Sequence, residues 1–249
     1  MPATDKENAE VPDLILQPSQ FWTTELVAAL ADLQYPDDDD PRAAPLVHAV
    51  NAAGHHSALM GLDHPIRLEV LGPLGDYACA FNRQAVVRIR GAVGNAAADG
   101  MSSGAVRIHG RAGHAAGVAM QGGTLSVYGH AGDRCGAGLC GGEIFIRGNV
   151  GDEAGVGALR GTIVIGGSAG RGLGDAMSGA TVFIRGEVAS LAPSVVEAPL
   201  RERERVRLGL LLINASIRGE AKDFRRIVPR EVWEREQSQP RSEIDPSWR

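Results

Sequence analysis

Apolar and polar residues alternate in short segments that recur through the middle of the chain. Val87 and Ile89 flank Arg88 in one segment, and the next segment has the same form. This alternation is typical of β-strands, whose successive side chains point to opposite sides. It predicts seven strands with apolar pairs at Leu68/Val70, Val87/Ile89, Val106/Ile108, Leu125/Val127, Ile144/Ile146, Ile163/Ile165 and Val182/Ile184.

Glycines follow these strands at a fixed spacing. Seven of them recur at every nineteenth position, at Gly72, Gly91, Gly110, Gly129, Gly148, Gly167 and Gly186. A second glycine comes at the third position after each of the first six, at Gly75, Gly94, Gly113, Gly132, Gly151 and Gly170. Paired glycines are expected at tight turns, where the backbone needs positive φ or a close approach to another segment. Partial columns at Gly117, Gly136, Gly155 and Gly174 and at Gly104, Gly123, Gly142 and Gly161 complete each repeat.

A 19-residue unit cannot bury its own apolar face, so successive units must stack. Each strand then pairs in parallel with the strand one repeat away, and the predicted fold is an all-β solenoid, a parallel β-helix of about seven coils. At the usual strand spacing its length is roughly 30–35 Å. Small residues and a column of Met101, Met120, Leu139 and Met177 are expected to fill the interior, which leaves little room there for an active site.

Glycine and charge divide the chain into three regions. Residues 1–60 form an acidic extension, with helices expected at 23–33 and 44–53 and a solvated loop at the aspartates of 37–40. Residues 61–191 form the repeat. Residues 192–249 are rich in arginine and glutamate and are expected to be helical.

Composition excludes several classes of protein. The formal net charge of −5 argues against a general nucleic-acid binder, and no apolar run is long enough to cross a membrane. Only three cysteines are present, and the first residues lack the pattern of a secretion signal. A cytoplasmic protein is the expectation.

Two features of the repeat resemble chemical sites. Residues 136–141 match the dinucleotide fingerprint G-x-G-x-x-G, but a coil strand is expected after them where that motif requires a helix. Cys135 and Cys140 lie close together without a second pair at metal-ligand spacing, so both are interpreted as small inward residues.

Polar residues at one position of the repeat, and two neighbouring histidines, are the remaining candidates. Side chains that bond local backbone explain the column Asp76, Asn95, His114, Asp133 and Asp152 without a metal. His55 and His56 are interpreted as loop residues without a ligand. The residues alone therefore predict a scaffold with no catalytic, cofactor-binding or metal site.

One column of residues on the outer side of the strands changes from basic to apolar along the repeat. Arg88 and Arg107 are followed in later coils by Phe145, Val164 and Phe183. This apolar stripe is a candidate interface. We expect it to be covered either by another subunit or by the chain's own C-terminal segment. The segment 203–213 is a plausible helical cover, with Val206, Leu210 and Ile213 on one face.

The glycine spacing resembles that of a known family. The segments 110–117 and 129–136 carry the pattern G-x-x-G-x-x-x-G, which is similar to the GXGXG domain at the C-terminal end of the glutamate synthase large subunit. The lead-in segments 61–70, 75–77 and 81–85 and the tail 222–226 resemble the stand-alone middle subunit of N-methylglutamate synthase-type enzymes. The resemblance covers about residues 45–228.

This resemblance implies a right-handed parallel β-helix that acts as a structural subunit of a hetero-oligomer. One expected partner is a glutamine amidotransferase-like subunit, and the other is an FMN-dependent, iron–sulfur synthase-like subunit. The catalytic cysteine, the flavin and the cluster would belong to those partners. The alternatives are a GXGXG subunit of a formylmethanofuran dehydrogenase or formyltransferase/hydrolase complex, and a free-standing binding module.

Overall fold

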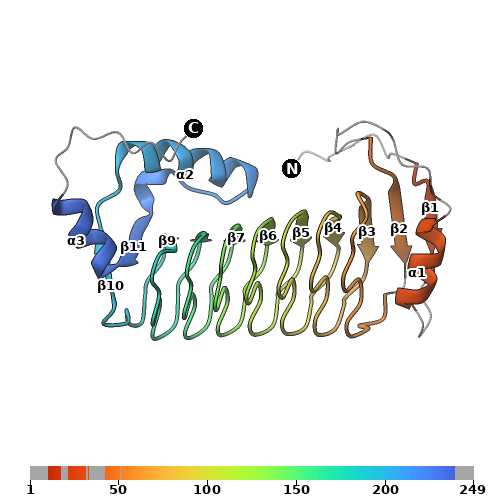
Figure 1. Ribbon diagram of the computed structural model, residues 1–249, viewed down its shortest axis with the longest axis horizontal. Helices are drawn as coiled ribbons and strands as arrows, with labels where there is room; N and C mark the ends of the chain where they lie inside the picture. Colours follow the sequence, from red (N-terminus) through yellow and green to blue (C-terminus); the bar gives the residue numbers. More distant parts are fainter. Residues whose placement is uncertain (1–10, 18–21, 32, 34–42, 51, 239–249) are drawn as a thin grey trace, which may run out of the picture.

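The computed structural model describes residues 11–17, 22–31, 33, 43–50 and 52–238, and it is a β-solenoid (Figure 1). The predicted parallel β-helix is therefore confirmed. Nine consecutive strands pair in parallel along its length. They are β1 (Leu14–Leu16), β2 (Leu46–Val50), β3 (Arg67–Leu71), β4 (Val86–Ile89), β5 (Ala105–Ile108), β6 (Thr124–Val127), β7 (Glu143–Ile146), β8 (Thr162–Ile165) and β9 (Thr181–Ile184).

The register follows the 19-residue spacing from β3 to β9. Val87 pairs with Val106, which in turn pairs with Leu125, and all three side chains are fully buried. Alternation places these residues in the interior and the residues between them on the outer face of the sheet. The predicted inward column is also buried, namely Met101, Met120, Leu139 and Met177.

The thirteen turn glycines serve mainly to let coils approach one another. Only Gly72 among them has positive φ, at +126°. For each of the other twelve, a Cβ would lie less than 3.0 Å from backbone atoms of the preceding coil; at Gly110 it would lie 2.7 Å from the Gly91 carbonyl. Positive φ belongs to the partial columns, as at Gly117, where φ is +71°. A side chain at any of these twelve positions would therefore push neighbouring coils apart.

The N-terminal end differs from the sequence prediction. The helix expected at 44–53 is wrong, because Leu46–Val50 forms β2, with Val47 and Ala49 fully buried against the solenoid core. The first helix is present as α1 (Trp22–Ala31), and its Leu26 and Leu30 belong to the same core cluster. The helix therefore covers the open end of the apolar interior beside β1 (Figure 1). The acidic loop predicted at 37–40 lies outside the described residues.

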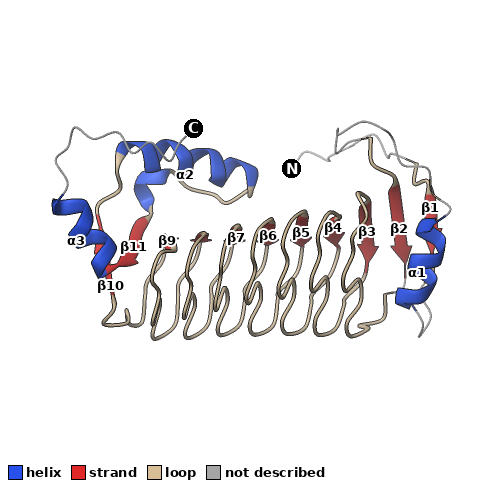
Figure 2. Cartoon of the chain, in the orientation of Figure 1, coloured by secondary structure: helices blue, strands red, loops and turns tan. Residues whose placement is uncertain are grey.

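The C-terminal end combines helices with two antiparallel strands (Figure 2). The additional strands are β10 (Val195–Ala198) and β11 (Arg225–Pro229), and the sheet order ends β9-β11-β10. Helix α2 (Glu202–Asn214), a 3₁₀ helix (Ala221–Asp223) and α3 (Arg230–Ser238) accompany them. Because β11 runs antiparallel to β9, it ends the run of parallel coils.

One buried arginine joins these terminal elements. Arg226 of β11 is 3 % exposed, and its Nε lies 2.8 Å from Glu204 Oε1 of α2. Its Nη2 donates to Glu236 Oε1 of α3 at 2.7 Å. Burial lowers the pKa of Arg226, while Glu204 opposes that change. The ion pairs hold both helices against the final strand.

Helix α2 covers the apolar stripe of the outer face. Phe145, Val164 and Phe183 are at most 5 % exposed and form a second hydrophobic cluster with the helix and the segment that follows it. The chain's own C-terminal segment is thus the cover, and the candidate interface is not available to another subunit in this structure.

The face of α2 that makes this contact is opposite to the predicted one. Leu208, Leu211 and Leu212 are buried, whereas the predicted residues are 60 % to 75 % exposed at Val206, Leu210 and Ile213. At 100° per residue the two sets lie on opposite sides of the helix. The helix is therefore apolar on both sides, and one side faces solvent.

Candidate functional site

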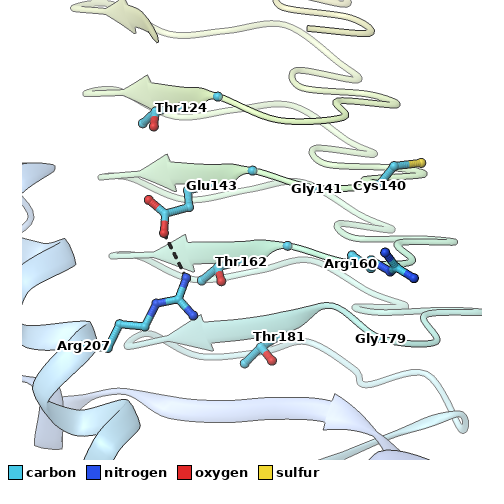
Figure 3. A pocket seen from close by; sticks show the side chains of 12 residues that line it. Thr124, Cys140, Gly141, Glu143, Arg160, Thr162, Gly179, Thr181 and Arg207 are labelled. Atoms are coloured by element: carbon cyan, nitrogen blue, oxygen red, sulfur yellow. Dashed lines mark hydrogen bonds and ion pairs between the residues drawn. The ribbon is translucent and has the colours of Figure 1, made fainter. Parts of the chain in front are cut away.

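An open groove runs along the beginnings of β6 to β9, beside α2 (Figure 3). Its volume is about 650 Å3. Turn glycines line the groove together with one column of side chains. The column consists of the first residues of β6 to β9, which occupy the same position in successive coils, namely Thr124, Glu143, Thr162 and Thr181. The lining residues named in Figure 3 are Thr124, Cys140, Gly141, Glu143, Arg160, Thr162, Gly179, Thr181 and Arg207.

The charges of the groove are partly paired. Glu143 extends from β7 toward α2, where Arg207 Nη2 donates to its Oε1 at 3.1 Å (Figure 3). Arg160 points away from this pair (Figure 3). Threonine hydroxyls and one arginine can hydrogen-bond a polar ligand. No histidine is among the described residues that line the groove beside Cys140.

The three cysteines divide into two kinds. Cys79 and Cys135 are fully buried, and burial raises the pKa of each thiol to about 12. Both are therefore neutral packing residues at ordinary pH. Cys140 is exposed, so its interpretation as an inward residue is wrong. Alternation explains the difference, because the preceding Leu139 occupies the inward position.

The dinucleotide-like segment 136–141 forms a coil turn that leads into β7, as the repeat predicts. A Cβ at Gly136 would lie 2.6 Å from Ile163 Cδ1 in the solenoid interior. That glycine is required by internal packing, and its backbone does not form a ligand cradle.

The polar column at the second turn forms a ladder of hydrogen bonds between coils. Asn95 N–H donates to Asp76 Oδ1 at 2.6 Å, and His114 N–H donates to Asn95 Oδ1 at 2.9 Å. The same contact repeats at Asp133 and Asp152. These side chains bond backbone, but the prediction that the backbone is local is wrong, because the bonded N–H groups belong to the next coil. His56 begins the ladder, since its Nδ1 accepts from Asp76 N–H.

A second ladder was missed in the sequence. Asn149 N–H donates to His130 Nδ1, and Ser168 N–H donates to Asn149 Oδ1. The only signal is the periodic spacing of polar residues just after the first turn glycine. The ladders use the side chains that resembled metal ligands, and no group of three or more histidine, cysteine or acidic side chains in the described ranges could hold a metal ion.

A cationic face lies on the outer side of β4 and β5, and we define it by Arg88, Arg90, Arg107 and His109. Arg88 and Arg107 are neighbours in register and are half-buried. Burial lowers the pKa of His109, and the nearby Arg90 and Arg88 lower it further. Glu69 opposes this change in the pKa of His109.

Glu69 of β3 is the carboxylate closest in register to this face. Its Oε1 accepts from Arg90 Nε at 2.6 Å, and its Oε2 lies 3.4 Å from His48 Nε2. Arg88 and Arg107 have no ion-pair partner among the residues that the structure describes. The positive charge of the face is therefore only partly neutralised.

No protein-family model matches the chain, and no curated protein matches it significantly. No helix in the described part of the chain is long and apolar enough to span a membrane.

Proposed function

We propose that this chain is a non-catalytic scaffold subunit of a glutamate synthase-like complex of the N-methylglutamate synthase type. In that complex it would hold a glutamine amidotransferase-like subunit and an FMN-dependent, iron–sulfur synthase-like subunit in the cytoplasm. The glutaminase cysteine, the flavin and the cluster would all belong to the partners.

The observation that carries this proposal is the role of the glycines on which the resemblance rests. Gly110 and Gly113 are in columns where the coils touch, and Gly117 takes a positive φ that its turn requires. The pattern therefore specifies a packed rod. Because the interior is filled by residues such as Met120 and Leu139, any function must use the outer surface.

The outer surface supports a role in assembly. One half of the sheet face is covered by the chain's own helix, while the half that carries Arg88 and Arg107 has no such cover in the described structure. The groove beside α2 is open, and its one carboxylate is already paired with Arg207. These features favour contacts with other chains over catalysis.

Purification of the tagged, full-length chain from its native source tests the proposal. We expect a flavin-containing complex with glutaminase activity, from which the separated chain is colourless and inactive. Co-purification with an amidohydrolase-like metal protein would favour the one-carbon alternative. A chain that stays alone and binds a small molecule in its groove would contradict both.

A further inference from the structure

The central outward column of the sheet is apolar at β7 to β9 and basic at β4 and β5. We call the part of the outer face at β3 to β6, which α2 does not cover, the bare half. At β7 to β9 the central outward residues are Phe145, Val164 and Phe183, and α2 lies along the rod over them (Figure 1). At β4 and β5 the same column holds Arg88 and Arg107. Between the two halves, the column holds the buried Ser126 of β6, which pairs in register with Phe145.

The bare half carries an excess of positive charge. The outward positions of β4 to β6, including those that directly follow the strands, hold three arginines and no carboxylate, and the adjacent outward position of β3 holds Glu69; the arginines are Arg88, Arg90 and Arg107. Arginines directly opposite on adjacent strands repel each other, which destabilises the sheet. Arg88 and Arg107 stand in this arrangement, and Glu69, which is next to Arg88 in register, contacts Arg90 and His48 with its two carboxylate oxygens.

The dimensions of the bare half match those of a helix. Helix α2 has 13 residues and is about 20 Å long. Four coils, β3 to β6, extend about 14–19 Å at the usual strand spacing. Carboxylates at positions i and i+4 of a helix are about 5–6 Å apart, which is close to the roughly 4.8 Å between Arg88 and Arg107 in adjacent coils.

We propose that the cationic face is a docking site for an acidic helix of a partner protein, which lies along the rod in line with α2. Carboxylates on one side of that helix pair with Arg88 and Arg107, and Arg90 and His109 flank them. Charge complementarity favours an acidic polypeptide. This inference rests on the proposed function only in requiring that the chain has a protein partner.

A synthetic peptide tests the chemistry directly. The probe is a fluorescent, alanine-based helical peptide about as long as α2, with glutamates at i and i+4, and its control has glutamines in their place. We expect the full-length chain to bind the glutamate peptide more tightly and the binding to weaken with salt. The double variant Arg88→Glu, Arg107→Glu should lose about tenfold or more in affinity.

Matched variants make the result specific. The double variant Arg171→Glu, Arg203→Glu changes net charge equally at exposed arginines outside both the cationic face and the groove and should bind within about twofold of the unchanged chain. The milder pair Arg88→Gln, Arg107→Gln provides the same test if charge reversal disturbs folding, which melting curves would detect.

Equal loss of affinity in both reversal variants, or equal binding of the glutamine peptide and the glutamate peptide, would overturn the proposal. Tighter, Arg88-dependent binding of a single-stranded DNA oligonucleotide would do so as well.

The same variants separate this inference from the proposed function. Expressed in the native source, the Arg88/Arg107 reversal should release a partner that the Arg171/Arg203 reversal retains. If both retain an amidotransferase and a flavoprotein, the scaffold function holds and the docking site is wrong. If the released partner is unrelated to either, the docking site holds and the proposed function is wrong.

Discussion

The two sides of α2 provide a test that compares one substitution at two positions. Leu212 is 3 % exposed and belongs to the cluster with Phe145, Val164 and Phe183, whereas Leu210 is 60 % exposed on the opposite side. Leucine to alanine at a buried site costs about 2–5 kcal/mol. Because α2 lies at the surface and can settle toward the sheet, we expect Leu212→Ala to cost about 2–3 kcal/mol.

Leu210→Ala is the matched control. It makes the same change in helix propensity, so that contribution cancels in the comparison. Since little of the Leu210 side chain is buried, its loss should cost under about 1 kcal/mol. The difference between the variants therefore isolates packing against the stripe.

Hydrogen exchange followed residue by residue is the suitable assay, because contacts in a solenoid are local and a single melting temperature does not report on one helix. We expect Leu212→Ala to accelerate exchange in α2 while the amides of β3 to β5 stay protected. Equal acceleration by the two variants, or a larger effect of Leu210→Ala, would show that the other side of the helix is the buried one.

Three further predictions concern the coils. Gly110→Ala should lower the melting temperature more than Gly138→Ala, because its Cβ would meet backbone at 2.7 Å, whereas the Cβ at Gly138 has open space and only a strained φ of +60°. A thiol reagent at pH 8 should modify Cys140 in the native chain, and Cys79 and Cys135 only after unfolding, since their pKa is raised to about 12. For the same reason the two buried thiols stabilise the fold fully below their ordinary pKa of 9.0, and that contribution should fall as the pH rises from 9 toward 12, measured by denaturant unfolding.

The coils could be predicted from the sequence because their period is strict. Each strand from β3 to β9 begins one full period after the last, so alternation and glycine spacing agree. The spacing breaks before β3, because Leu46 pairs with Arg67, which lies two positions beyond the period. A short strand outside the period has the same apolar content as a short helix, and that is why β2 was assigned wrongly.

The surroundings of the sheet could not be derived from local pattern. Helix α2 is apolar on two sides, and periodicity alone cannot tell which side meets the stripe. Glu143 and Arg207 form the ion pair of the groove although they are far apart in the sequence. The cationic face is different, because Arg88 and Arg107 already share an outward column in the sequence.

The regular register also makes the rod a spacer of adjustable length. Each coil adds one 19-residue segment and about 4.8 Å along the axis, and it returns the chain to the same outward columns. Insertion or deletion of one whole coil between β5 and β7 would therefore change the distance between the two ends in a fixed step and would leave the cationic face and the apolar stripe intact. A partner bound at the cationic face and one bound beside α2 would move apart or together by the rise of one coil, while each keeps its own contacts.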